Sequence, residues 1–179
     1  MRKPRLIAIA AVAMAALMNA GVIDASSETE VEAKGTEDFQ PNALFKSTFQ
    51  FAPGDITVNS GDTVTWIDND KLNLPHTITI VDAEDLPVEF GTAYVCLGAD
   101  IIPDVDFDGL CLPFLAAHGG VAFSMPVVNV GGTGLDARGD SLFLPPDGSV
   151  SAQVTAAPGA TLHYMCILHP WMQGTITVE

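Results

Sequence analysis

Beyond residue 42 the chain consists mainly of short stretches in which polar and apolar residues alternate, separated by turn-forming residues. Residues 63–67 (TVTWI) and 76–81 (HTITIV) alternate as half-buried strands do, and a turn sequence at residues 59–62 (NSGD) precedes them. No segment beyond the N-terminal 25 residues has apolar residues at helical spacing. Roughly seven or eight short strands separated by turns predict an all-β sandwich or barrel.

The N-terminus has the three-part layout of a secretory signal. Arg2, Lys3 and Arg5 precede an apolar run at residues 6–18, and small and polar residues follow it. That run is shorter than the roughly 18–20 residues that a helix needs to cross a bilayer. We therefore interpret residues 1–25 as a signal peptide of an exported protein, periplasmic, extracellular or on the cell surface. The alternative is an uncleaved membrane anchor.

The remaining chain is strongly acidic. Loss of residues 1–25 would leave four basic and 21 acidic residues, a net charge of −17. Such a surface repels nucleic acid and attracts a partner with a basic docking surface. Residues 26–42 (SSETEVEAKGTEDFQPN) are so polar that we expect a flexible acidic spacer, with the folded domain at residues 43–179.

Three cysteines in an exported protein predict one disulfide and one cysteine left for other work. Cys96 and Cys111 lie close together in a loop-rich insertion at about residues 82–140, and we expect them to pair. A long insertion with little regular structure is usually functional or held by a cross-link. Cys166 is then the free cysteine.

The same insertion contains a weak calcium candidate. Asp104, Asp106 and Asp108 are spaced as at the start of an EF-hand loop, and Gly109 follows them. Leu115 stands where that loop requires a glutamate, so the pattern favours a solvated acidic turn over a calcium site.

The most specific chemical signal is Cys166-Ile-Leu-His169-Pro-Trp-Met172, a C-x2-H-x2-M motif between two predicted strands. A thiolate, an imidazole and a thioether are soft donors, which suit copper far better than magnesium or calcium. His76 begins a strand 90 residues earlier and supplies a second imidazole if the two strands meet at one end of the sandwich. Two histidines and a cysteine near one plane with a weak axial methionine form a blue-copper site.

Two further histidines are not expected to bind the metal. Side chains alternate along a strand, so His163 points away from the face that carries Cys166. His118 lies in the insertion with no partner motif.

Two separate segments resemble the cupredoxin family of blue-copper proteins. The first reads F-x-P…ITVxxGDTVTWxDNxKxxxPHT over residues 51–77, and the second reads YxCxxHPWMxGTITV over residues 164–178. The ligand-loop spacing is most similar to that of amicyanin. Thr77 stands where small members of the family often have asparagine, and Leu168 replaces a common proline. The Thr77 hydroxyl could still hydrogen-bond across to the ligand loop.

This resemblance implies an eight-stranded Greek-key β-sandwich that binds one mononuclear type 1 copper ion and transfers single electrons. It carries over His76, Cys166, His169 and Met172 as ligands. We expect His169, flanked by Pro170 and Trp171, to form an apolar electron port for a redox protein partner. The alternatives are a copper-dependent redox enzyme and a copper-binding surface module. An enzyme needs an open coordination position, which four protein ligands do not leave.

Overall fold

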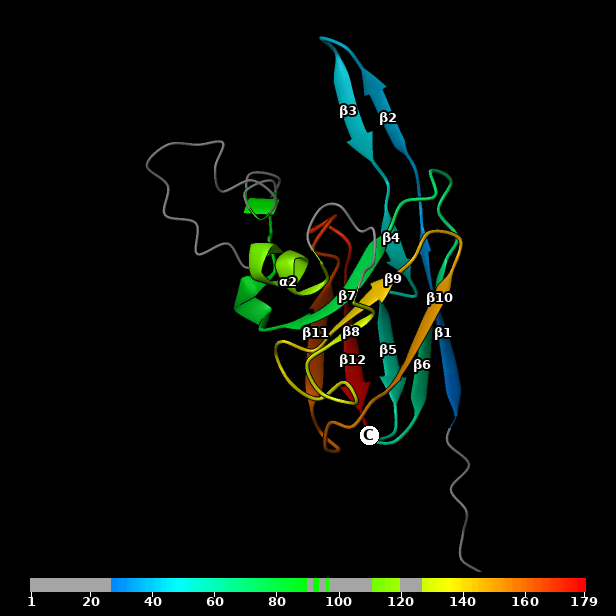
Figure 1. Cartoon of the computed structure of the whole chain (residues 1–179), viewed down its shortest axis with the longest axis vertical. Coiled ribbons are helices and arrows are strands. Elements are labelled where there is room, and N and C mark those ends of the chain that lie inside the picture. The colour runs from blue at the N-terminus through cyan, green and yellow to red at the C-terminus, as the bar shows by residue number, and fades with distance from the viewer. Residues whose placement is uncertain (1–26, 90–91, 94–95, 97–110, 120–126) are drawn as a thin grey trace, which may run out of the picture.

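The computed structural model describes residues 27–89, 92–93, 96, 111–119 and 127–179. Two β-sheets pack face to face, and a separate two-stranded hairpin projects from one end (Figure 1). The predicted β-sandwich is confirmed. The strands are β1 (Glu28–Lys34), β2 (Glu37–Gln40), β3 (Leu44–Ser47), β4 (Gln50–Ala52), β5 (Asp55–Val58), β6 (Thr63–Asp68), β7 (His76–Val81), β8 (Asn129–Val130), β9 (Ser141–Leu144), β10 (Ser149–Gln153), β11 (Thr161–Met165) and β12 (Gln173–Val178).

The first sheet has four strands in the order β10-β6-β1-β4. β1 runs parallel to β6 and antiparallel to β4, and β10 runs antiparallel to β6. Its inner face contributes Trp66, which is fully buried and meets the ring of Tyr164 from the other sheet at a centroid distance of 6.0 Å. Alternate residues of each strand face this core, as the sequence pattern requires.

The expectation of a flexible spacer at residues 26–42 is wrong. Residues 28–34 form β1, a central strand of the first sheet, and residues 37–40 form β2. Val31 and Ala33 are fully buried in the main core, while the side chains at positions 28 and 30 are exposed. A strand at the face of a sandwich needs an apolar residue only at every second position, and the intervening acidic residues hid this alternation.

The second sheet has six strands in the order β5-β12-β11-β7-β9-β8. On β11, Leu162 and Tyr164 belong to the main core between the sheets, as does Cys166 just beyond it. Met165 and Ile167 lie in a smaller apolar cluster on the opposite face. The predicted alternation is therefore present, and it turns Cys166 toward the interior of the sandwich.

A close approach of two chain segments fixes β12 beside β5. The Tyr164 hydroxyl donates a hydrogen bond of 2.8 Å to the carbonyl of Gly54. A Cβ atom at Gly174 would lie 2.1 Å from the same carbonyl oxygen, so only glycine fits there.

The β2–β3 hairpin extends beyond the sandwich (Figure 1). Phe39 and Phe45 face each other across its two strands and keep 70% and 46% of their surface exposed. The sequence did not predict this projecting arm.

The insertion at residues 82–140 contains more regular structure than the sequence predicted. It includes the 3₁₀ helix η1 (Ala83–Asp85), the helix α2 (Cys111–Ala117) and the strand β8. The predicted disulfide between Cys96 and Cys111 is confirmed. Leu135 is buried in the main core, and Asp140 accepts backbone hydrogen bonds that shape the turn before β9.

Two predictions fall on parts of the chain that the structure does not describe. The proposed signal at residues 1–25 and the calcium candidate Asp104, Asp106 and Asp108 both lie outside the described residues. Within the described ranges, no helix is both long and apolar enough to cross a membrane.

Candidate metal centre

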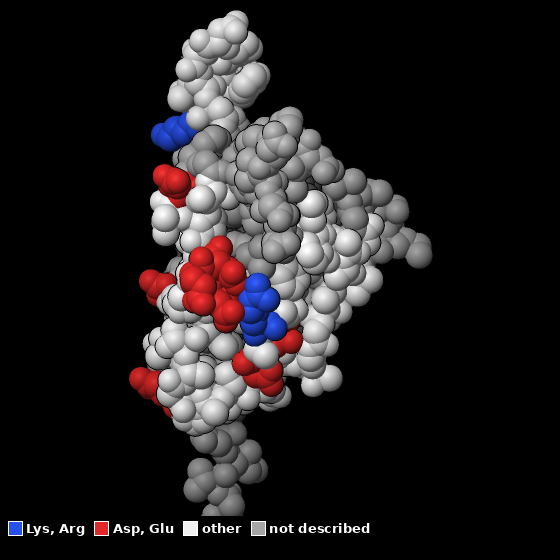
Figure 2. All heavy atoms as spheres, turned by 90° about the vertical axis from the view of Figure 1, so that its left-hand side faces the viewer, with Lys and Arg blue, Asp and Glu red and all other residues white. Residues whose placement is uncertain are grey.

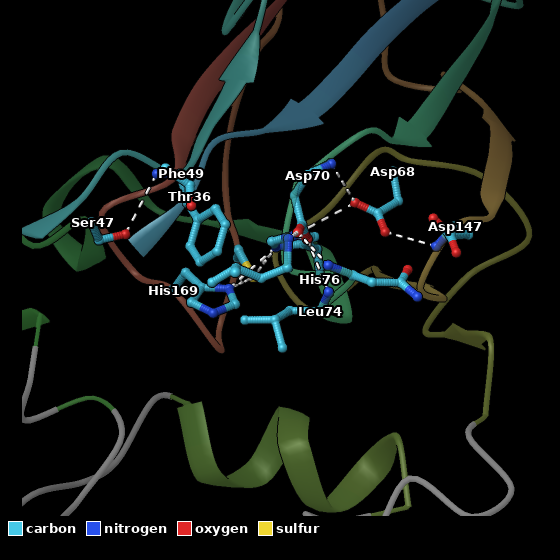
Figure 3. Close-up of polar contacts among 12 residues, drawn as sticks. Thr36, Ser47, Phe49, Asp68, Asp70, Leu74, His76, Asp147 and His169 are labelled. Carbon is cyan, nitrogen blue, oxygen red and sulfur yellow. Dashed lines mark hydrogen bonds and ion pairs between the residues drawn. The ribbon is translucent and has the colours of Figure 1, made fainter. Parts of the chain in front are cut away.

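Three of the four predicted ligands meet at one end of the sandwich. His76 begins β7, Cys166 follows β11, and His169 lies in the loop between β11 and β12. Cys166 Sγ lies 3.8 Å from His76 Nδ1 and 3.6 Å from His169 Nδ1, and the two nitrogens are 3.2 Å apart. Figure 3 shows both imidazole rings turned toward each other at this point.

The dimensions of this donor triangle suit a bound metal ion. A point at its centre is about 2.1 Å from all three atoms, and metal–nitrogen and metal–sulfur bonds in zinc proteins are about 2.0–2.3 Å long. Two imidazoles and one thiolate in a plane form the trigonal set found in blue-copper sites. His76, Cys166 and His169 fit the donor set of a blue-copper site.

Backbone hydrogen bonds hold the loop that carries Cys166, His169 and Met172 in a tight turn. The N–H of Cys166 donates to the carbonyl of Met172 at 3.0 Å, and that of Met172 donates to His169 at 2.8 Å. The N–H of His169 in turn donates to the carbonyl of Cys166 at 3.2 Å. Met172 is fully buried in the main core within this loop.

The thiol of Cys166 loses its proton more readily than an ordinary cysteine does. Its burial alone would raise the pKa, but hydrogen bonds and charge interactions with His169 and His76 outweigh burial and hold the pKa well below its usual range. The Cys166 side chain is fully buried, and it is the free cysteine of the described residues. A thiolate is the form that binds metal.

The outer nitrogen of His76 is bound to a carboxylate that sequence analysis did not identify. His76 Nε2 lies 2.9 Å from Asp70 Oδ2, and both side chains are fully buried (Figure 3). Because the ionised carboxylate can only accept, Nε2 carries the hydrogen and Nδ1 is left free for a metal. Asp70 thus fixes both the orientation and the tautomer of the His76 ring.

The loop before His76 is folded around Asp70. This carboxylate also accepts backbone N–H bonds from Leu72, Asn73 and Leu74. Burial disfavours its charge, but the bonds from His76 and from these amides lower its pKa below the ordinary value of 3.8. Asn73 has a φ of 57°, a left-handed conformation that asparagine tolerates better than most residues.

A second carboxylate supports this loop. Asp68 ends β6 and lies 3.8 Å from His76 Nε2, and it accepts backbone bonds from Asp70 at 3.2 Å and Asp147 at 2.8 Å. Asp68, Asp70 and His76 therefore offer a second group of close donors. The carboxylate oxygens already accept these hydrogen bonds, so the closeness of the three side chains is explained without an ion.

Thr77 makes the cross-connection that its hydroxyl was expected to allow. Its backbone N–H donates to Cys166 Sγ at 3.3 Å, and its Oγ1 accepts from the N–H of Ile167 at 2.9 Å. A hydrogen bond to the thiolate stabilises its charge. The replacement of asparagine by threonine thus retains a bond between the two ligand-bearing segments.

The expected apolar port is smaller than predicted. His169 keeps 9% of its surface exposed, whereas His76 and Cys166 are fully buried. Trp171 is half-buried and donates from Nε1 to Ser47 at 3.0 Å, but Pro170 is buried rather than exposed. The ring of Phe49, which directly precedes β4, lies 4.8 Å from that of His169 and helps to close the site.

The two remaining histidines lie apart from the donor triangle. His163 is in the middle of β11 and is not among the close donors of the described residues. His118 is fully buried between the insertion and the second sheet.

No protein-family model and no curated protein matches the sequence. Among solved structures, the chain is similar to a purple cupredoxin from Nitrosopumilus maritimus, with 15% identity over 84% of this chain and 99% of that chain and a TM-score of 0.42. It is similar to auracyanin from Roseiflexus castenholzii, with 21% identity over 87% and 98% of the two chains and a TM-score of 0.40. For amicyanin from Paracoccus versutus the values are 11%, 87% and 84%, with a TM-score of 0.39. At such low identities and TM-scores, these similarities carry no argument about the site. The description of the site therefore depends on the sheets and the close donors of this chain.

Proposed function

We propose that the protein binds one type 1 copper ion and carries single electrons between redox partners. His76, Cys166 and His169 would hold the ion together with Met172. The observation that supports this function is the buried triangle of two Nδ1 atoms and one Sγ atom, with sides of 3.2–3.8 Å. Its size and softness fit copper.

Bound copper would supply a reversible one-electron couple between its cuprous and cupric forms. The chain contributes a site that changes little between the two. Asp70 holds His76 from behind, Thr77 holds the backbone next to Cys166, and the turn at residues 166–172 is closed by its own backbone bonds. The fully buried thiolate is also shielded from water and from outside thiols.

Electrons would enter and leave through the exposed edge of His169, which is the ligand with residual surface exposure among the three close donors. Acidic side chains outnumber basic ones on the face in Figure 2, and the whole chain has a formal net charge of −15. We expect a redox partner with a basic docking surface, attracted by long-range electrostatics. We also propose that residues 1–25 direct export, which is consistent with a disulfide in the folded chain.

The function is tested by adding Cu²⁺ to the purified metal-free protein. The expected result is an intense absorption band at about 600 nm from a thiolate–copper(II) bond, saturating at one ion per chain. Cys166→Ser should abolish the band, and His163→Ala, which changes a histidine outside the triangle, should retain it. A colourless protein that binds only copper(I) would point to a copper-binding module. Turnover of a small substrate by the loaded protein would point to an enzyme.

A further inference from the structure

A buried row of side chains joins the ligand loop to the insertion. Starting from the N–H of Ile167, hydrogen bonds lead to Thr77 Oγ1 at 2.9 Å, to Thr79 Oγ1 at 3.1 Å, to Ser141 Oγ at 2.7 Å and to His118 Nε2 at 2.8 Å. The other ring nitrogen of His118 is hydrogen-bonded to the carbonyl of Val127. The four side chains of this row, Thr77, Thr79, Ser141 and His118, are all fully buried.

His118 fixes the direction of every bond in the row. The carbonyl of Val127 can only accept, so neutral His118 carries its hydrogen on Nδ1 and accepts at Nε2. Ser141 must then donate to His118, Thr79 to Ser141 and Thr77 to Thr79. At the other end, the N–H of Ile167 can only donate, and it requires a lone pair of Thr77 Oγ1. The direction set by His118 is compatible with this bond, because Thr77 Oγ1 keeps a lone pair for it while its hydrogen points to Thr79.

Bonds arranged donor to acceptor in one direction polarise and strengthen one another. If His118 is removed, the Ser141 hydroxyl loses its acceptor and the direction of the row is no longer set from that end. The Thr77 hydroxyl is then free to rotate, which changes the direction of the lone pair that accepts from the N–H of Ile167. Ile167 follows Cys166 directly, so its amide position affects how the Sγ atom is placed.

His118 itself is held by the insertion. Its backbone N–H bonds to Phe114 at 3.0 Å in α2, the helix that begins at the disulfide residue Cys111. Its carbonyl accepts from the N–H of Val127 at 3.3 Å, so these two residues are bonded to each other twice. The row thus begins on an element that is cross-linked within the insertion and ends beside the thiolate.

We propose that His118 is a positioning residue, which sets the direction of the Thr77–Thr79–Ser141 hydroxyl row and thereby holds the Cys166–Ile167 peptide in place. The expected effect on the metal centre rests on the proposed copper function: His118 changes the properties of the centre without contacting the metal. The hydrogen-bond geometry of the row involves only atoms of this chain and can be tested without metal.

The first test is the tautomer of His118 in the metal-free protein, measured by ¹⁵N NMR of the imidazole nitrogens above pH 7. The expected result is a protonated Nδ1 and an unprotonated Nε2. A protonated Nε2 in the neutral ring would reverse the direction of the row and overturn the proposal. This measurement needs no variant, so it does not depend on whether a substitution folds.

The second test is the hydrogen exchange of the Ile167 amide in the metal-free protein. His118→Phe should accelerate exchange by roughly two- to tenfold relative to neighbouring amides of β11, which corresponds to the loss of up to one hydrogen bond. His118→Gln, which keeps one donor and one acceptor, should restore part of the protection. His163→Phe, the matched change outside the row, should leave it unaltered. Equal exchange at Ile167 in the wild type and in His118→Phe would refute the coupling.

The third test uses the copper-loaded protein. The reduction potential should shift in His118→Phe and in Thr77→Val, and the shift of the double variant should differ from the sum of the two, because both changes act on one row. Strict additivity would show that His118 acts only through general stability. If these variants keep the blue band, the copper site is intact and the result concerns the role of His118 alone. If the proposed copper function is wrong, the wild type itself will lack the band.

Discussion

Replacing Asp70 with asparagine should raise the reduction potential of the copper-loaded protein. The carboxylate is fully buried 2.9 Å from His76 Nε2, and its negative charge favours the more highly charged oxidised metal. Across the imidazole ring, its oxygen lies about 7 Å from an ion bound at Nδ1 with a bond of about 2.0 Å. At an effective dielectric constant of about 20, one charge at this distance contributes about 2.4 kcal/mol. For a one-electron couple this is about 100 mV.

The shift can be measured by voltammetry or by spectroelectrochemical titration of the blue band. Asp38→Asn is the matched control, because it removes the same charge from an exposed position on the β2–β3 hairpin, where solvent and salt screen it. We expect the control to shift the potential far less. A blue Asp70→Asn protein with an unchanged or lower potential would refute the role given to the carboxylate.

Four further predictions follow from the same contacts. Met172→Gln should change the reduction potential with a smaller effect on unfolding; an unchanged potential would remove Met172 from the metal site. His163→Ala should leave the copper spectrum intact, and loss of the blue band would mean that this histidine is a ligand. Tyr164→Phe should lower the free energy of unfolding in urea by about 1 kcal/mol, because it deletes the bond to Gly54; no change would show that this bond does not contribute. Burial lowers the pKa of His118 below the ordinary value of 6.5. Just below pH 6.5 this residue is therefore protonated in the unfolded chain but still neutral in the folded chain. The stability that this residue contributes is therefore complete above pH 6.5 and decreases as the pH falls below it; urea unfolding of the wild type should show this loss, and His118→Gln should not.

The donor cluster could be predicted because its signals are local. Cys166, His169 and Met172 lie within seven residues, and their donor chemistry is unusual enough to define the site. His76 could be added because it opens an alternating strand, and strand alternation also separated His163 from Cys166. The disulfide followed from the number of cysteines.

The features that the sequence did not reveal depend on distant contacts or on an uncommon composition. β1 was overlooked because its outward positions are acidic, although Val31 and Ala33 keep the alternation of a buried strand. Asp70 carries no local sign that its carboxylate would reach His76. The row from Thr77 to His118 joins β7, β9 and the insertion, and only the pairing of those strands brings the hydroxyls together.

Copper K-edge X-ray absorption of the loaded protein tests the central claim most directly. We predict one sulfur donor and two imidazole nitrogens at about 2.0–2.3 Å. Cys166→Ser should remove the sulfur contribution. A first shell of oxygen and nitrogen atoms without sulfur would contradict the account, since it would place the ion away from Cys166.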